Sequence, residues 1–388
     1  MKLLFAANTN ADPNQGASGC DLATIAALRG KGCTVDTIWA DDMPRRIQHG
    51  NLHQLWELPT RFANAVSQRC LTTSYDVIQV NQPHAYLAAR EHQQLSRPGI
   101  FVNRSHGWEP HVHEAMDRLP SHTDRSAIRD LCSKAMWSLI RSHNSKVLQY
   151  SDGIVLCSVD DRDFIIRNSE INPHKLLALA PGIAPDFLVP IAPLEGRSRK
   201  LLYVGQFTAH KAPLIVAEIA NEAMLSCPDV TLTWVCSKSD HQKVYAALKP
   251  AIHSRVSVLP WMPREQLRGV YDEHGILLFP SRFEGFSLTF LEAMARGLCV
   301  LATNIDGMRQ TISHGSTGFL FGIDSVSDFV QQLLILLRDP DQSAQIGRKA
   351  RTVAETFTWE RTASELLQFY EVLHSAKKNG RFAMSQIR

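Results

Sequence analysis

Two glutamates, Glu284 and Glu292, stand in the mostly apolar stretch "FPSRFEGFSLTFLEAMARGLCVLATNIDG", residues 279–307. Runs within it, such as "ILLFP" and "CVLAT", are typical of strands buried on both faces, where carboxylates are usually excluded. A desolvated carboxylate needs a partner, and carboxylates accept strongly from hydroxyl donors such as those of sugars. The stretch therefore indicates a ligand site.

The start of a helix lies between these glutamates. Ser287 is a good N-cap, so we expect a helix from about Leu288 to Arg296 that Gly297 ends. Unpaired amides at such a terminus suit a phosphate. They would belong to Phe286, Ser287 and Leu288. Spacing alone leaves a second interpretation open, in which Glu292 is a solvated helix residue and Glu284 a loop acid.

Three other places hold residues that suit an anionic ligand. Lys211 lies in "LLYVGQFTAHKAP" and offers a cation. Gly16 and Gly19, in "NADPNQGASGCDLA", allow close approach of the backbone, and we expect a helix from near Cys20 to direct its amides at an anion. His106 follows an apolar strand in "FVNRSHGWE". A surface lysine, a plain turn and a structural histidine are the alternatives.

A metal site is the interpretation that we reject. Asp161-x-Asp163 in "SVDDRDF" resembles a metal-binding pair, but Ser158 followed by Asp161 is better explained as an N-cap with acids in the first helical turn. The eight cysteines are scattered without C-x-x-C pairs. We expect reduced core thiols in a cytosolic protein, not a disulfide framework or a zinc site.

The composition is that of a globular protein with about two domains. The chain has 388 residues, of which 44% are hydrophobic and 20% charged, and its net charge is +3. This charge is too small to predict nucleic acid as a partner. The first residues, "MKLLFAAN", have too short an apolar run for a signal peptide and predict a buried strand.

Short apolar runs alternate with helical stretches twice along the chain, which predicts two parallel sheets built from βαβ units. Between them, "PGIAPDFLVPIAPLEGRSRK", residues 181–200, is rich in proline and lacks periodicity. We expect an N-terminal domain at 1–185, a linker at 186–199 and a second domain at 200–355. Residues 356–388 would form a C-terminal helix that can return to the first domain, with a basic tail.

The stretch from Pro280 to Phe321, "PSRFEGFSLTFLEAMARGLCVLATNIDGMRQTISHGSTGFLF", resembles the donor-site signature of family-4 retaining glycosyltransferases, with its E-x7-E motif at Glu284 and Glu292. The resemblance implies the GT-B fold: an α/β protein with two Rossmann-like domains facing each other across a cleft. It implies that Glu284 contacts the transferred sugar and that Glu292 binds the ribose hydroxyls. Diphosphate or sugar would meet the amides of Gly285, Phe286, Ser287 and Leu288.

The same resemblance covers the other three places. It implies that Lys211 binds the donor diphosphate, that Gly16 is approached by donor sugar or diphosphate, and that His106 contacts the donor sugar. At two donor-loop positions the chain departs from the family: Gln206 replaces a usual arginine and Ala212 a frequent glycine. The segment "WMPREQLRGVY" resembles the one that packs beside the nucleotide base.

The implied reaction is transfer of a sugar from a UDP- or GDP-sugar to an acceptor hydroxyl, with the anomeric configuration retained, in glycan, glycolipid or polysaccharide synthesis. No cofactor or metal is implied. Because Gln206 removes a second cation, a catalytically silent nucleotide-sugar binder or scaffold remains an alternative, as does a GT-B-fold nucleotide-sugar epimerase.

The acceptor, whether sugar, glycolipid or protein, would lie against the first domain. The segment at 109–150 that matches this place is basic and carries apolar residues at helical spacing. Its basic residues are Arg118, Arg125, Arg129, Lys134, Arg141 and Lys146, and its apolar ones Ile128, Leu131, Ala135 and Leu139. One interpretation is an anionic acceptor, or peripheral contact at the inner face of a membrane by a cytoplasmic protein. The other is a helix packed on its own domain. His111 and His113 would be loop residues.

Overall fold

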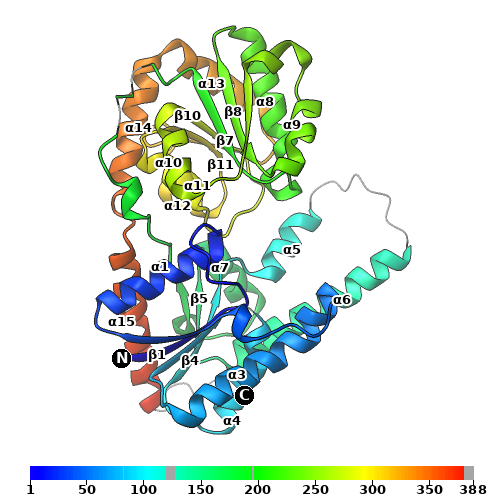
Figure 1. Ribbon diagram of the computed structural model, residues 1–388, viewed down its shortest axis with the longest axis vertical. Helices are drawn as coiled ribbons and strands as arrows, with labels where there is room; N and C mark the ends of the chain where they lie inside the picture. Colours follow the sequence, from blue (N-terminus) through cyan, green and yellow to red (C-terminus); the bar gives the residue numbers. More distant parts are fainter. Residues whose placement is uncertain (82, 119–126, 192, 195, 380–388) are drawn as a thin grey trace. The chain divides into compact units, whose positions relative to one another are not determined.

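The computed structural model describes residues 1–81, 83–118, 127–191, 193–194 and 196–379 (Figure 1). Contacts divide the chain into two units. Unit 1 consists of Met1–Ala180 together with the chain from Trp359 onward, and unit 2 of Pro181–Thr358. The expected α/β class with two parallel sheets is confirmed.

Unit 1 is built on a six-stranded parallel sheet in the order β2-β1-β3-β4-β5-β6. The strands are β1 (Lys2–Ala6), β2 (Thr34–Ile38), β3 (Val77–Asn81), β4 (Ile100–Ser105), β5 (Gly153–Leu156) and β6 (Leu176–Ala178). The helices are α1 (Gly16–Gly30), α2 (Gly50–Leu52), α3 (Leu58–Thr72), α4 (Tyr86–Gln94), α5 (Glu109–Asp117), α6 (Ala127–Tyr150), α7 (Val159–Asn168) and α15 (Trp359–Lys378).

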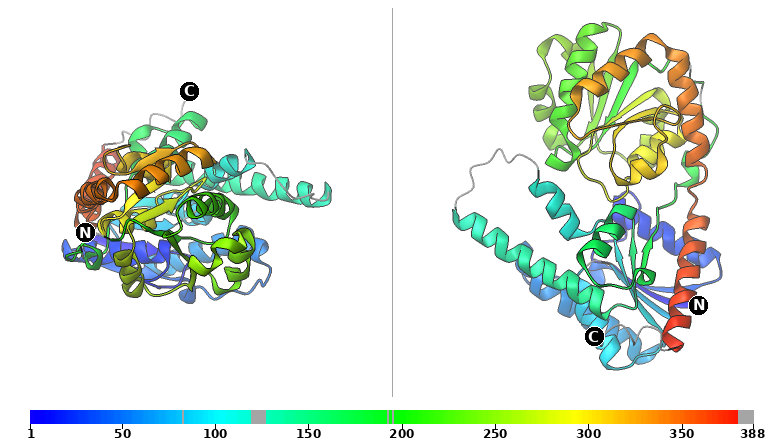
Figure 2. Two further views of the ribbon diagram at one scale, coloured as in Figure 1. Left: turned by 90° about the horizontal axis from the view of Figure 1, so that it is seen from above. Right: turned by 180° about the vertical axis from the view of Figure 1, so that it is seen from behind.

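Alternate residues of β1 face opposite layers of helices. Leu3 and Phe5 pack with α1 and α15, whereas Leu4 and Ala6 pack with α3 and α4 (Figure 2). A sheet covered on both faces explains why its strands read as unbroken apolar runs. The apolar runs of the first half of the chain, "KLLFAAN", "TVDTIWA", "YDVIQVN", "GIFVNRSHG" and "GIVLCS", contain β1 to β5, as predicted, whereas β6 has three residues and was not predicted.

Unit 2 repeats this plan in the order β12-β11-β10-β7-β8-β9, again parallel. Its strands are β7 (Lys200–Val204), β8 (Thr231–Cys236), β9 (Val256–Pro260), β10 (Ile276–Phe279), β11 (Cys299–Thr303) and β12 (Phe319–Phe321). Its helices are α8 (Pro213–Ser226), α9 (His241–Ala247), α10 (Arg264–Glu273), α11 (Leu288–Ala295), α12 (Asp306–Thr311), α13 (Val326–Arg338) and α14 (Pro340–Ala354). The sequence predicted each of these six strands from a short apolar run.

The C-terminal part of the chain forms two helices, α14 in unit 2 and α15 in unit 1. One local prediction was wrong. His111 and His113, expected in a loop, lie in α5, where they pair with Asp161 and Asp117. Arg125 of the basic segment lies outside the described residues. As for membrane spans, the described helices include none that is long and apolar enough to cross a bilayer.

The proline-rich segment before β7 is fastened to unit 2 by one buried guanidinium. Arg296 is 1% exposed, and its Nη atoms donate to the carbonyl oxygens of Phe187, Val189 and Pro190 at 2.8–3.1 Å. Its Nε donates to Asp272 at 2.7 Å. Because this segment has no sheet partner, its carbonyls need donors from elsewhere, and Arg296 supplies three of them while Arg351 donates to Leu188.

We expect Arg296→Ala to destabilise unit 2 by about 3 kcal/mol, because three carbonyls lose their donors at once and Asp272 loses its cation. Urea denaturation with hydrogen exchange of β10 and β11 amides measures the effect. Arg338→Ala, on the exposed end of α13, is the matched control and should change stability by less than about 0.5 kcal/mol. Equal effects of both variants would contradict the prediction.

Candidate active site

Lys211 and Glu284 meet in unit 2. Lys211 follows β7 and Glu284 follows β10, two neighbouring parallel strands, so both loops start from the same edge of the sheet. Lys211 Nζ lies 2.5 Å from Glu284 Oε1, and the two side chains are 17% and 10% exposed. Lys211 Nζ also lies 5.4 Å from the centre of the Phe279 ring. The pair thus sits where ligands of α/β sheets bind.

A second ion pair fixes the loop that carries Glu284. Arg282 donates through Nε and Nη2 to the two carboxylate oxygens of Asp324, at 2.7 and 2.9 Å. Its amide donates to the His210 carbonyl at 2.7 Å. Because Asp324 follows β12, the loops after β7, β10 and β12 are held together at this edge, which limits the freedom of Glu284.

Helix α11 begins directly after this loop, as expected, with Ser287 at its N-cap and Gly297 at φ 76° after its end. The Ser287 hydroxyl makes no capping bond to the helix. The Phe286 ring packs inward, 5.3 Å from Phe290 and 6.0 Å from Phe357. Inward packing of Phe286 and the missing side-chain cap leave the first amides of α11 for another acceptor.

Glu292 lies in α11 and is 5% exposed. Its Oε2 accepts from the Tyr271 hydroxyl at 3.2 Å, and its Oε1 lies 3.8 Å from Arg264 Nε. Burial raises the pKa of Glu292 to about 7 although Arg264 and Tyr271 both lower it. Additional hydroxyl donors would favour the charged carboxylate.

The two departures from the family pattern lie in the loop after β7. Ala212 has φ 48° and ψ 51°, a left-handed conformation that glycine adopts without strain. This geometry explains the family's preference for glycine there. Gln206 has an exposed side chain, and its carbonyl accepts from the Thr208 amide at 2.9 Å.

In unit 1, His106 belongs to a buried polar cluster at the carboxyl ends of β3 and β4. His106 Nε2 lies 2.9 Å from Asp21 Oδ1, and Asn81 Nδ2 donates to Asp21 Oδ2 at 2.6 Å. His106 Nδ1 lies 3.8 Å from the sulfur of Cys157. Burial alone would lower the pKa of His106, but Asp21 outweighs it and raises the pKa to about 9. At neutral pH the ring is therefore a cation.

Arg104 gives the same cluster a second cation. It is 1% exposed, lies 3.9 Å from Asp21 Oδ1, and donates to the Thr24 hydroxyl at 3.0 Å. Although burial opposes it, Asp21 raises the pKa of Arg104 above its ordinary value. With His106 protonated, the two cations and one carboxylate leave a net positive charge beside α1.

Helix α1 begins at Gly16, not near Cys20 as expected, so Gly16 itself supplies one of the free terminal amides. A Cβ added at Gly16 would meet nothing within 4 Å. The chain itself imposes no steric need for glycine here, which leaves room for a ligand to approach the backbone.

The sequence missed six residues that hold these sites: Asp21, Asn81, Arg104, Tyr271, Arg282 and Asp324. Arg264 and Tyr271 lie within the segment expected beside the base. The other five could not be recognised from the sequence, because each of them contacts residues that follow other strands.

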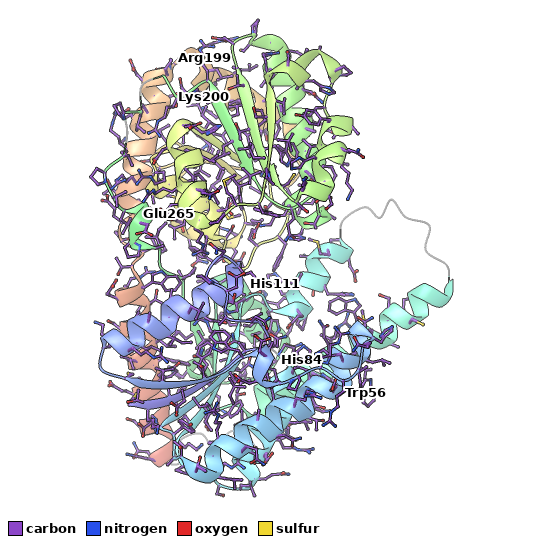
Figure 3. All side chains as sticks on the ribbon, viewed as in Figure 1. Trp56, His84, His111, Arg199, Lys200 and Glu265 are labelled. Carbon is purple, nitrogen blue, oxygen red and sulfur yellow. The ribbon has the colours of Figure 1, made fainter. Side chains whose placement is uncertain are left out.

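The rejected metal pair has other partners. The Asp161 amide donates to Ser158 Oγ at 2.9 Å, which confirms the N-cap. The carboxylate of Asp161 accepts from the Trp108 amide at 3.1 Å and lies 2.7 Å from His111, labelled in Figure 3. Within the described part of the chain, no group of three or more His, Cys, Asp or Glu residues could hold a metal ion.

We expect Asp324→Asn to loosen the loop that carries Glu284. Asparagine tolerates the positive φ of 59° at this position, so the variant removes the charge of the Arg282 pair and keeps the backbone. Hydrogen exchange of amides 281–287 should accelerate, with little change in overall stability. Asp328→Asn, in the exposed first turn of α13, is the control. Unchanged exchange in Asp324→Asn would contradict the clamp.

The raised pKa of His106 predicts a pH-dependent stability. Since its folded pKa of about 9 exceeds the ordinary 6.5, its contribution is complete below pH 6.5 and is lost as the pH rises through 9. Between these limits, the protonation of His106 in the folded state should make the free energy of unfolding fall by roughly 1.4 kcal/mol per pH unit as the pH rises. The difference in unfolding free energy between wild type and His106→Gln isolates it from other titrating groups. A difference that does not vary with pH would refute the assignment.

Comparisons with known proteins give a family match for the part of the chain that holds Lys211, Glu284 and Glu292. The model described as glycosyl transferases group 1 matches residues 198–339. The chain is 28% identical over 246 residues to the D-inositol 3-phosphate glycosyltransferase of Rhodococcus jostii, a match of 58% of this chain and 54% of that protein. The chain thus spans about half the length of this relative.

Two solved structures cover nearly the whole chain. One is sucrose-phosphate synthase from Thermosynechococcus elongatus, with a TM-score of 0.73 at 18% identity over 97% of this chain and 100% of that one. The other is HepE from Anabaena in complex with UDP and glucose, with a TM-score of 0.69 at 17% identity over 96% and 100%. The resemblance to family-4 glycosyltransferases is confirmed: the chain carries a glycosyl transferases group 1 domain and has the GT-B fold.

Proposed function

We propose that the protein is a retaining glycosyltransferase of the hexosyltransferase type, which transfers a sugar from a UDP- or GDP-sugar to an acceptor hydroxyl. The observation that carries the proposal is the contact between Lys211 and Glu284 at the start of α11. It joins a cation, an anion and free helix amides, which are the groups that a sugar diphosphate requires.

On this proposal the donor replaces the contact that Lys211 and Glu284 make with each other in its absence. Lys211 turns to the diphosphate, whose second set of contacts is the amides of Gly285, Phe286, Ser287 and Leu288. Glu284 then accepts from hydroxyls of the sugar. Each half of a nearly buried ion pair thereby keeps a charged or hydrogen-bonding partner, so neither is desolvated alone.

On the same proposal, Glu292 accepts hydrogen bonds from the ribose hydroxyls of the donor. Its carboxylate already accepts from Tyr271 and faces Arg264, and hydroxyl donors would lower its pKa from about 7. Donor binding near neutral pH therefore releases a proton from this site.

The proposed contribution of unit 1 is positive charge. The net positive cluster of Asp21, Arg104 and His106 and the amides from Gly16 onward attract an anionic ligand. His106 orients the donor sugar while Asp21 holds the ring charged and in place. Gln206 replaces a family arginine, so the loop after β7 offers Lys211 without a second cation.

The chemistry follows from these positions. The bond from the anomeric carbon to the diphosphate oxygen breaks, and the acceptor oxygen bonds to the same face of that carbon. The acceptor proton passes to the leaving diphosphate oxygen, and Lys211 and the α11 amides stabilise its growing charge. The proposal assigns no metal. HepE was solved with UDP and glucose, which supports a nucleotide donor, and the curated relatives' name makes inositol 3-phosphate one acceptor to test.

The test is donor turnover. UDP-, GDP- and ADP-sugars are screened by thermal shift, because a ligand that binds only the native state raises its stability. Release of nucleoside diphosphate is then measured with the best donor. We expect Glu284→Gln to lower kcat/KM by about 10²-fold or more and Lys211→Ala to weaken donor binding as well.

Lys243→Ala is the control, since Lys243 is 60% exposed and pairs with Asp240 on α9; it should leave turnover unchanged. Full activity of Glu284→Gln would overturn the proposal. A stabilising donor without hydrolysis or transfer would favour the silent binder, and an isomerised nucleotide sugar without free nucleotide would favour the epimerase.

A further inference from the structure

Unit 1 has a pocket that shares no residue with either part of the candidate active site. Its volume is about 610 Å³, and it lies between the chain after β2 and the first turns of α3. This connection leaves the carboxyl end of β2, the edge at which α/β sheets bind ligands. Its lining includes Asp42, Arg46, Trp56, Thr60, Asn64 and Gln68.

Trp56 is the most conspicuous side chain of this pocket. It is 62% exposed, more than any other Trp, Tyr or Phe of the described residues, and lies at the outer edge of unit 1 (Figure 3). It belongs to a π-helical turn, His53–Glu57, between α2 and α3. Such turns are rare and frequent at functional sites, and the extra residue rotates the side chains that precede it relative to α3. An indole ring that is mostly exposed to solvent indicates a binding surface for a flat, partly apolar ligand.

The turn beneath Trp56 is rigid. Glu57 Oε1 accepts from the Arg46 amide at 2.9 Å and from Arg61 Nε at 2.7 Å, while Oε2 accepts from the Ile47 amide at 2.9 Å and lies 2.7 Å from His53 Nδ1. All of its acceptor directions are occupied, so this carboxylate fixes the pocket wall and is not available to a ligand.

The groups left for a ligand are largely neutral. Thr60, Asn64 and Gln68 recur every four residues along α3, over about 12 Å, and Trp56 precedes them in the π-helical turn and lines the same pocket. Among the described residues, the side-chain amides of Asn64 and Gln68 and the guanidinium of Arg46 have no hydrogen-bond partner. The lining contains two arginines, one aspartate and one glutamate, so it favours neither anions nor cations.

An aromatic face beside a row of amides and a hydroxyl is complementary to a sugar chain. The C–H face of a pyranose packs on an indole, and its hydroxyls both donate to and accept from planar amides. We propose that this pocket binds a neutral oligosaccharide, with Trp56 as the stacking platform and Asn64 and Gln68 as the hydrogen-bonding row. Its identification as a remote part of the glycosyl acceptor rests on the proposed function; the binding itself does not.

Binding is measured by calorimetry on the full chain without any nucleotide sugar, so failure of transferase activity cannot affect the result. The probes are neutral hexasaccharides of glucose, mannose, galactose, xylose and N-acetylglucosamine. We expect at least one to bind, and Trp56→Ala to weaken it at least tenfold. Asn64→Ala/Gln68→Ala should weaken it several-fold. Leu71→Ala is the matched control: Leu71 is 74% exposed on the same helix outside the pocket, and binding should stay within twofold.

Absence of binding by every probe, or equal binding by wild type and Trp56→Ala, overturns the proposal. So does a dimer that sedimentation detects in wild type and that Trp56→Ala dissociates, because the indole would then contact a second copy. If a bound hexasaccharide also serves as acceptor, Trp56→Ala should raise its KM and leave the donor KM unchanged.

Discussion

Parallel pairing of β7 with β10 is the constraint on which the proposed donor site depends. It directs the loops after both strands to one edge of the sheet, so Lys211 and Glu284 meet although they are far apart in the chain. An ion pair so little exposed to water has a desolvation cost that its own attraction barely offsets. A donor that offers an anion to one partner and hydroxyls to the other can therefore displace the pair without stranding either charge, which makes the resting contact a prepared state for binding.

The charges of the two units differ in a way that suits a divided task. In unit 1, one buried carboxylate serves two cations, and Asp21 keeps His106 protonated. In unit 2, Glu292 stands in surroundings that favour its neutral form until hydroxyl donors arrive. A permanent positive cluster attracts an anion at any pH near neutral, whereas a carboxylate poised near 7 responds to what is bound.

The sequence predicted the elements better than their contacts. Strands such as "ILLFP" were recognisable because sheets covered on both faces need unbroken apolar runs, and Ser287 and Gly297 marked α11 by local rules. β6 was not predicted, because three residues are too few to show a periodicity.

The partners of Asp21, Arg282 and Arg296 could not be predicted. Each meets residues that follow other strands or lie in an extended segment, so its role depends on sheet order and not on spacing in the chain. Trp56 was also missed, because the sequence does not show that it lies in a π-helical turn with its side chain exposed.

The departures from the family at Gln206 and Ala212 have different physical weight. Ala212 adopts the left-handed conformation at a cost of roughly 1–2 kcal/mol, which is a term in the stability of unit 2. Gln206 removes a charge, and no backbone adjustment can replace it. If the donor diphosphate is held as proposed, Lys211 and the first amides of α11 hold it without a second cation from this loop. The departure at Gln206 therefore bears on donor affinity, whereas the departure at Ala212 bears on stability.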